Sequence, residues 1–172
     1  MNATANEPAT EPAATEESAS IRLKRILVPI DFSDCSKKAL QYAKPFAEQF
    51  HAEIVLLHVS SVNYMVAEGF GGIDLPTLRT DLMEDAEKQL GEIAGVLESN
   101  GASVTLIVRE GRAASEIVEY AKEANVDLIV MSTHGYSNIK HVLLGSVTEN
   151  IVRHAPCPTL AVREREHDFV AA

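Results

Sequence analysis

Short apolar runs alternate with amphipathic stretches along most of the chain. The apolar runs are rich in Val, Ile and Leu and short enough for buried strands; they cover 25–31, 53–59, 103–109, 126–131 and 158–162. Between them, apolar residues recur every three or four positions, as on one face of a helix. This spacing predicts helices after Ser33 or Asp34 and over 76–100, 113–124 and 145–154.

The apolar runs are nearly continuous, which indicates strands buried on both faces. Strands of this kind form parallel sheets with helices on each side. We therefore expect an α/β protein with three α/β/α layers around an open, mostly parallel five-stranded sheet. In such sheets a ligand lies beyond the carboxyl ends of the strands, where the strand order reverses.

The segment 131–149 holds the clearest chemical signal. It follows an apolar strand and contains Gly135, and after nine further residues Gly145 and Ser146 open a helix. Glycine lets the backbone approach a ligand closely, and the unpaired N–H groups of a helix start favour an anion. Ser146 and Glu149 also fit a capping box, so a structural role and phosphate binding both stay open for this helix start.

Other candidate residues end the remaining strands and would share the same crevice edge. The carboxylate of Asp31 is able to accept hydrogen bonds from a ribose or a base, or to cap the next helix, and the two roles are compatible. His58 lies inside an apolar strand, which favours a hydrogen-bonded core histidine. The remaining candidates are Pro29, Val59, Met131 and Ser132.

Composition excludes several classes of function. The net charge of −10 opposes nucleic-acid binding and adsorption to a membrane. Two cysteines form no disulfide framework, which indicates a reducing, cytoplasmic setting. Residues 1–20 are acidic and rich in Ala, Thr and Ser, as in a disordered tail; a domain over 21–165 and a short tail over 166–172 follow.

Motifs of several enzyme classes are absent from the sequence. It has no Gly-x-x-x-x-Gly-Lys-Ser/Thr loop, no Gly-x-Ser-x-Gly elbow and no His and Cys at metal-ligand spacing. The lysine that a phosphoacceptor receiver domain needs after its fifth strand is also missing. We expect neither a catalytic residue nor a bound metal site, and any slow ATP hydrolysis would not be the purpose of the protein.

Five blocks in the chain, in the same order, resemble the universal stress protein family over about 24–164. They read ILVPIDFS at 26–33, LLHV at 56–59, STHG at 132–135, LLGSVTE at 143–149 and HAPCPTLAV at 154–162. The resemblance implies a Rossmann-like fold of the adenine-nucleotide α-hydrolase type, a role in stress resistance and a homodimer paired through the last strand, Thr159 to Val162.

One branch of that family binds ATP through Gly-x-x-Gly, nine residues and Gly-Ser/Thr. Gly135, Gly145 and Ser146 match this pattern, but Ser132 stands where it has its first glycine. The Ser132 side chain either crowds the ribose and first phosphate or hydrogen-bonds in place of the glycine. The resemblance assigns Pro29, Asp31 and Val59 to the adenosine pocket, Met131 and Ser132 to its edge, and Val147 and Thr148 to the phosphate end.

These observations lead to an expected function and a rival. The first is an ATP-binding regulatory module, a cytoplasmic homodimer that takes ATP together with Mg²⁺. The rival is a dimeric interaction protein of the same fold that binds no nucleotide, which Ser132 favours. AMP or a cyclic nucleotide as the ligand stays open.

Overall fold

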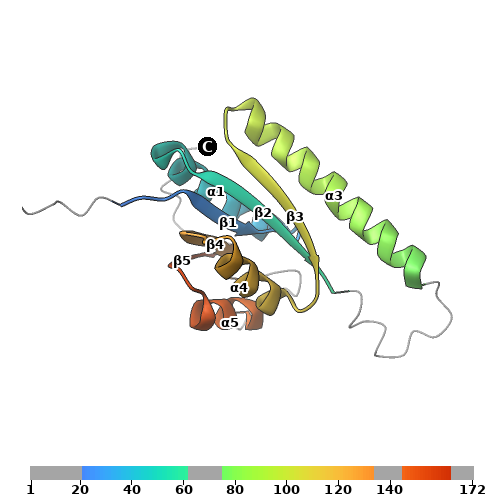
Figure 1. The fold of residues 1–172 in the computed structure, drawn as a ribbon. Coiled ribbons are helices and arrows are strands. Elements are labelled where there is room, and N and C mark those ends of the chain that lie inside the picture. Colours follow the sequence, from blue (N-terminus) through green and yellow to red (C-terminus); the bar gives the residue numbers. More distant parts are fainter. Residues whose placement is uncertain (1–20, 62–74, 134–144, 164–172) are drawn as a thin grey trace, which may run out of the picture.

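The computed structural model describes residues 21–61, 75–133 and 145–163 (Figure 1). Gly135 and the two predicted tails lie outside these residues. The strands are β1 (Arg25–Pro29), β2 (Glu53–Ser60), β3 (Val104–Glu110), β4 (Leu128–Ser132) and β5 (Thr159–Val162). The helices are α1 (Asp34–Phe50), α3 (Leu75–Ser99), α4 (Ala113–Glu123) and α5 (Ser146–His154).

All the strand pairs are parallel, in the order β3-β2-β1-β4-β5. The chain moves outward from β1 through β2 to β3, then crosses back to β4 on the other side of β1. Strand order therefore reverses between β1 and β4, and a crevice is expected beyond the carboxyl ends of these two strands. The predicted fold class is confirmed.

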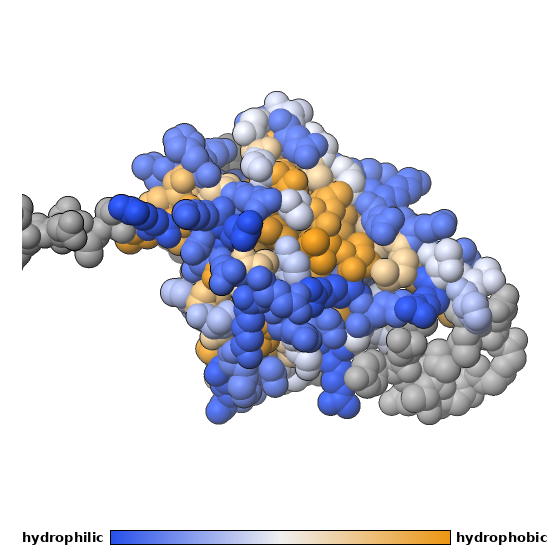
Figure 2. Space-filling view, in the orientation of Figure 1, coloured by the Kyte–Doolittle hydropathy of each residue, from blue (hydrophilic) through white to orange (hydrophobic). Residues whose placement is uncertain are grey.

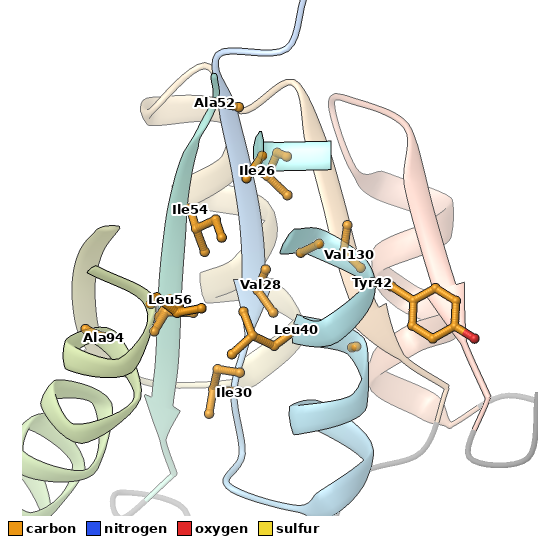
Figure 3. Packing of buried hydrophobic residues seen from close by; sticks show 14 of the residues in the cluster. Ile26, Val28, Ile30, Leu40, Tyr42, Ala52, Ile54, Leu56, Ala94 and Val130 are labelled. Carbon is orange, nitrogen blue, oxygen red and sulfur yellow. The ribbon is translucent and has the colours of Figure 1, made fainter. Parts of the chain in front are cut away.

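Two hydrophobic layers hold the sheet between its helices. Alternate residues of each strand point to opposite faces, so Val28 and Leu56 pack with α1 and α3 (Figure 3). Leu27 and Leu57 pack on the other face with α4 and α5. Burial on both faces explains why the strands read as unbroken apolar runs.

The start of β4 differs from the prediction. Val126 is buried, as its run indicated, but its N–H donates to Ala121 O at 3.0 Å and so closes the end of α4. The carboxylate of Asp127 then accepts the N–H groups of Lys24 and Arg25 at 2.7 and 2.9 Å. Val126 thus closes the end of α4, and Asp127 fixes the start of β1. Strand β4 therefore begins only at Leu128.

Gly91 lies on the exposed side of α3, where a Cβ would meet no atom within 4 Å. Glycine weakens a helix because its unfolded backbone has more freedom to lose. We expect Gly91→Ala to raise the free energy of unfolding by about 0.5–1 kcal/mol. Urea denaturation of the full chain measures this change, and an unchanged or lower stability would contradict it.

Candidate functional site

A cavity of about 320 Å³ lies beyond the carboxyl ends of β1 and β4. Every predicted site residue that the structure describes lines it: Pro29, Asp31, Val59, Met131, Ser132, Gly145, Ser146, Val147 and Thr148. The lining also contains residues that the sequence reasoning missed, namely Ile30, Ser36, Leu57, Ala113 and Ile117. The structure thus brings the candidates together, while their roles in binding stay predictions.

The β1–α1 loop holds Asp31 at the cavity. Asp31 Oδ1 accepts the Ser33 N–H at 3.1 Å and the Ser33 Oγ–H at 2.5 Å. Ser33 Oγ in turn accepts the Ser36 N–H at 3.2 Å and is the N-cap of α1. Asp31 therefore does not cap the helix itself; it orients the residue that does. Within the described residues no hydrogen bond engages Asp31 Oδ2, so this oxygen is able to serve a ligand.

His58 contacts the same β1–α1 loop. Its Nδ1 lies 2.8 Å from Ile30 O, and its ring packs on Phe32 with 4.7 Å between the ring centroids. Phe32 has φ 64°, a left-handed conformation that bulky side chains rarely adopt. The histidine is hydrogen-bonded, as predicted, but half-buried, and it supports the loop from outside the cavity lining.

The start of α5 corrects the predicted capping box. Gly145, not Ser146, is the N-cap, and no side chain caps the helix. Glu149 instead pairs with Arg153 at 2.9 Å. The first helical bond runs from Glu149 N to Gly145 O, so the N–H groups of Ser146, Val147 and Thr148 have no partner within the helix. These donors are what an anion at the cavity would use.

Close backbone contact explains the glycine at 145. Its N–H donates to Thr133 O at 2.9 Å, and a Cβ would lie 3.1 Å from that same oxygen. Its φ of −65° is ordinary, so limited space rather than conformation favours glycine here. A larger residue would have to push the start of α5 away from β4.

Thr148 is a second tie between α5 and β4. Its side chain is buried, and Oγ1 lies 3.0 Å from Ser132 O and 3.4 Å from Thr133 O. The hydroxyl donates to these carbonyls at the end of the strand, so it is engaged by protein. Thr148 therefore offers a ligand its backbone N–H rather than its hydroxyl.

We expect Thr148→Val to lower the free energy of unfolding by about 1 kcal/mol, because it removes the hydrogen bond from the hydroxyl to the end of β4 at nearly constant volume. Urea denaturation measures the loss. Ser146→Ala is the control, since Ser146 is exposed in the same helical turn; we expect a change within about 0.5 kcal/mol. Equal losses in both variants would contradict the proposed tie.

Electrostatics at the cavity come from helix ends. Its lining includes Ser36, Ala113 and Ser146, which lie in the first turns of α1, α4 and α5. A helix N-terminus carries a partial positive charge. Among the described lining residues Asp31 is the one ionisable side chain, and no cluster suited to a metal ion occurs in the described part of the chain. The cavity can hold an anion through N–H groups, and the described part of its lining contains no acid–base pair.

Together, the fold and the cavity define a Rossmann-like α/β protein with a cavity where β1 and β4 diverge. The profile of the universal stress protein family matches residues 22–163. The chain belongs to the universal stress protein family. None of its described helices is long and apolar enough to cross a bilayer.

Among its relatives is universal stress protein MJ0577 of Methanocaldococcus jannaschii, 33% identical over 85% of this chain and 98% of the relative. The solved MJ0577 structure gives a TM-score of 0.75 at 35% identity, covering 86% of this chain and 100% of that one.

Two more distant solved structures show the shared fold. One is a universal stress protein in complex with cAMP (22% identity, TM-score 0.57), covering 83% of this chain and 98% of that one. The other is from Archaeoglobus fulgidus in complex with dAMP (21%, 0.55), with the same coverage of 83% and 98%.

Proposed function

We propose that this chain binds an adenine nucleotide, ATP with Mg²⁺, in the cavity between β1 and β4. The observation that carries the proposal is the start of α5, where the N–H groups of Ser146, Val147 and Thr148 have no partner within the helix and their residues line the cavity. Backbone donors at a helix N-terminus bind phosphate without a lysine. This suits a chain whose net charge of −10 would otherwise repel the ligand.

The apolar part of the cavity lining suits a base. Pro29, Leu57, Val59, Ile117 and Met131 give it an apolar surface, and apolar walls with few polar groups are typical of small-molecule sites. Asp31 Oδ2 would accept a hydrogen bond from the ribose or the base. The family neighbours in complex with cAMP and dAMP are consistent with an adenine ligand.

Mg²⁺ would enter with the triphosphate. Asp31 is the one carboxylate among the described lining residues, and Mg²⁺ in nucleotide sites is held largely by phosphate oxygens, waters and one or two carboxylates. The chain's own contribution would be the Asp31 carboxylate and the α5 N–H groups. Since the described lining residues include no base placed to activate a water, we propose that turnover is not the purpose of this site.

Mg·ATP should stabilise the folded chain. A ligand that binds only the native state adds about 2.7 kcal/mol at a hundredfold excess over Kd, which raises the melting temperature of a domain of this size by about 5–10 °C. A thermal melt with and without Mg·ATP measures the shift. A melting temperature that does not change up to millimolar ATP would contradict the proposal.

The rival is a dimeric interaction protein that binds no nucleotide, and Ser132 at the cavity edge is the observation that favours it. Small molecules released by denaturing the freshly purified full chain discriminate between the two. Adenine nucleotide at near one per chain supports the proposal. Its absence, with no uptake when the chain is titrated with ATP, AMP or cAMP, supports the rival.

We further propose a cytoplasmic homodimer whose stability or partner choice follows nucleotide occupancy. The last strand, β5, ends the sheet and is paired on one side by β4. Among the described residues no strand lies on its outer edge, where a two-fold mate would satisfy the backbone groups. Val162 of β5 pairs with Ser132 of β4, and Ser132 lines the cavity. Binding of a ligand in the cavity would therefore affect the dimer contact.

A further inference from the structure

His58 contacts the chain on both sides of Asp31. On one side, the carbonyl oxygen of Ile30 lies 2.8 Å from His58 Nδ1; because a carbonyl only accepts, the imidazole is the donor. On the other side, the ring of Phe32 packs on the imidazole with 4.7 Å between the ring centroids. Asp31 lies between these two contacts and lines the cavity, so His58 limits how far its backbone can move.

A histidine is the exception on this face of the sheet. Its neighbours there, along β2 and across to β3, are Leu56, Leu106 and Val108, and Figure 2 shows hydrophobic surface gathered between β3 and α3. A leucine would serve packing at this position without a polar atom to satisfy. The hydrogen bond from His58 to the loop is therefore what distinguishes histidine from an apolar residue here.

The loop itself needs support from outside. Phe32 has φ 64°, and a bulky side chain holds such a conformation only where surrounding contacts enforce it. The same loop carries the carboxylate of Asp31, whose Oδ1 accepts the N–H and the Oγ–H of Ser33. The orientation of that carboxylate at the cavity thus depends on a strained segment that His58 contacts at two points.

We propose that His58 is a positioning residue for the nucleotide, and this role rests on the nucleotide binding proposed above. His58 does not line the cavity, so it acts through Asp31: it holds the β1–α1 loop in the conformation in which Asp31 Oδ2 meets the ribose or the base. A loop that is ordered before the ligand enters raises the affinity, because binding then has less freedom to remove.

The first test replaces His58 by leucine, which removes the donor to Ile30 O and keeps an apolar side chain of similar size. We expect the affinity for Mg·ATP to fall about five- to tenfold, as for the loss of one hydrogen bond. His58→Asn is the conservative variant, because its amide can donate to the same carbonyl, and its affinity should lie within about twofold of the unmodified chain. Titration calorimetry of the full chain measures both.

His154→Leu is the matched control. Nδ1 of His154 lies 2.8 Å from Asn150 O near the end of α5, so the same substitution removes the same kind of hydrogen bond. His154 does not line the cavity, and we expect an unchanged affinity for Mg·ATP. Urea denaturation shows which variants fold. If His58→Leu does not, Phe32→Leu removes the ring contact instead and should weaken binding about two- to fivefold.

A double-mutant cycle with Asp31→Ala separates positioning from a general loss of structure. Because His58 acts through the carboxylate, His58→Leu should cost no further affinity once Asp31 is alanine. Amide hydrogen exchange gives a second reading without ligand. The N–H of Ser33, which donates to Asp31 Oδ1, should exchange faster in His58→Leu and not in His154→Leu.

Four results would overturn the positioning role: unchanged affinity in a folded His58→Leu variant, equal losses in His58→Leu and His58→Asn, losses that add in the cycle, or unchanged exchange at Ser33. An unmodified chain that takes up no ATP is a different failure, because it overturns the proposed function together with this role.

Discussion

Substituting valine for Gly145 is expected to weaken ATP binding by about ten- to a hundredfold. A Cβ at this position already lies 3.1 Å from Thr133 O, and the valine methyl groups need more room. The start of α5 must move away from β4, which carries the N–H groups of Ser146 and Val147 with it. One lost hydrogen bond to a charged group costs about 1.5–3 kcal/mol, which corresponds to this range of affinity. Titration calorimetry with Mg·ATP measures the change.

Gly91→Val is the matched control for this variant. Gly91 has open space around its Cα and lies on α3, away from the cavity lining. We expect its ATP affinity to equal that of the unmodified chain. Urea denaturation of both variants separates lost binding from lost folding. Unchanged affinity in a folded Gly145→Val variant would show that the start of α5 does not hold the phosphates.

Replacing Leu56 by alanine is expected to lower the free energy of unfolding by about 3 kcal/mol. Leu56 is fully buried in the middle of β2, where it packs between α1 and α3 near Leu40 and Ala94 (Figure 3). Truncating a buried leucine removes its transfer free energy and leaves a cavity, at a cost of about 2–5 kcal/mol. Urea denaturation with a fixed m-value measures the loss.

Leu82→Ala is the control for the core substitution. Leu82 is 41% exposed on α3, and alanine has the higher helix propensity, so we expect a change of less than about 1 kcal/mol. If Leu56→Ala cost no more than Leu82→Ala, the packing of α1 and α3 on this face of the sheet would be wrong.

The sheet and its order of elements could be predicted from the sequence because burial on both faces leaves unbroken apolar runs. Element ends were less predictable where a distant group decides them. Val126 continues an apolar run, but the Asp127 carboxylate binds the N–H groups of Lys24 and Arg25. No local pattern reveals a contact between residues about a hundred positions apart.

The residues of the candidate site could likewise be predicted only in part from the sequence. The strand-end rule brought Pro29, Asp31 and Ser132 to one cavity because parallel strands share a carboxyl edge. Ala113 and Ile117 were missed although the rule also applies to the loop after β3. The capping box was wrong because Gly145, pressed against Thr133 O, takes the N-cap position, and that contact is tertiary.

A crystal structure of the full chain grown with excess ATP and Mg²⁺ tests the central claim most directly. We expect phosphate oxygens within hydrogen-bond distance of the N–H groups of Ser146, Val147 and Thr148, and the adenosine against Pro29 and Val59. A cavity blocked by the Ser132 side chain, or a nucleotide bound elsewhere on the chain, would contradict the account.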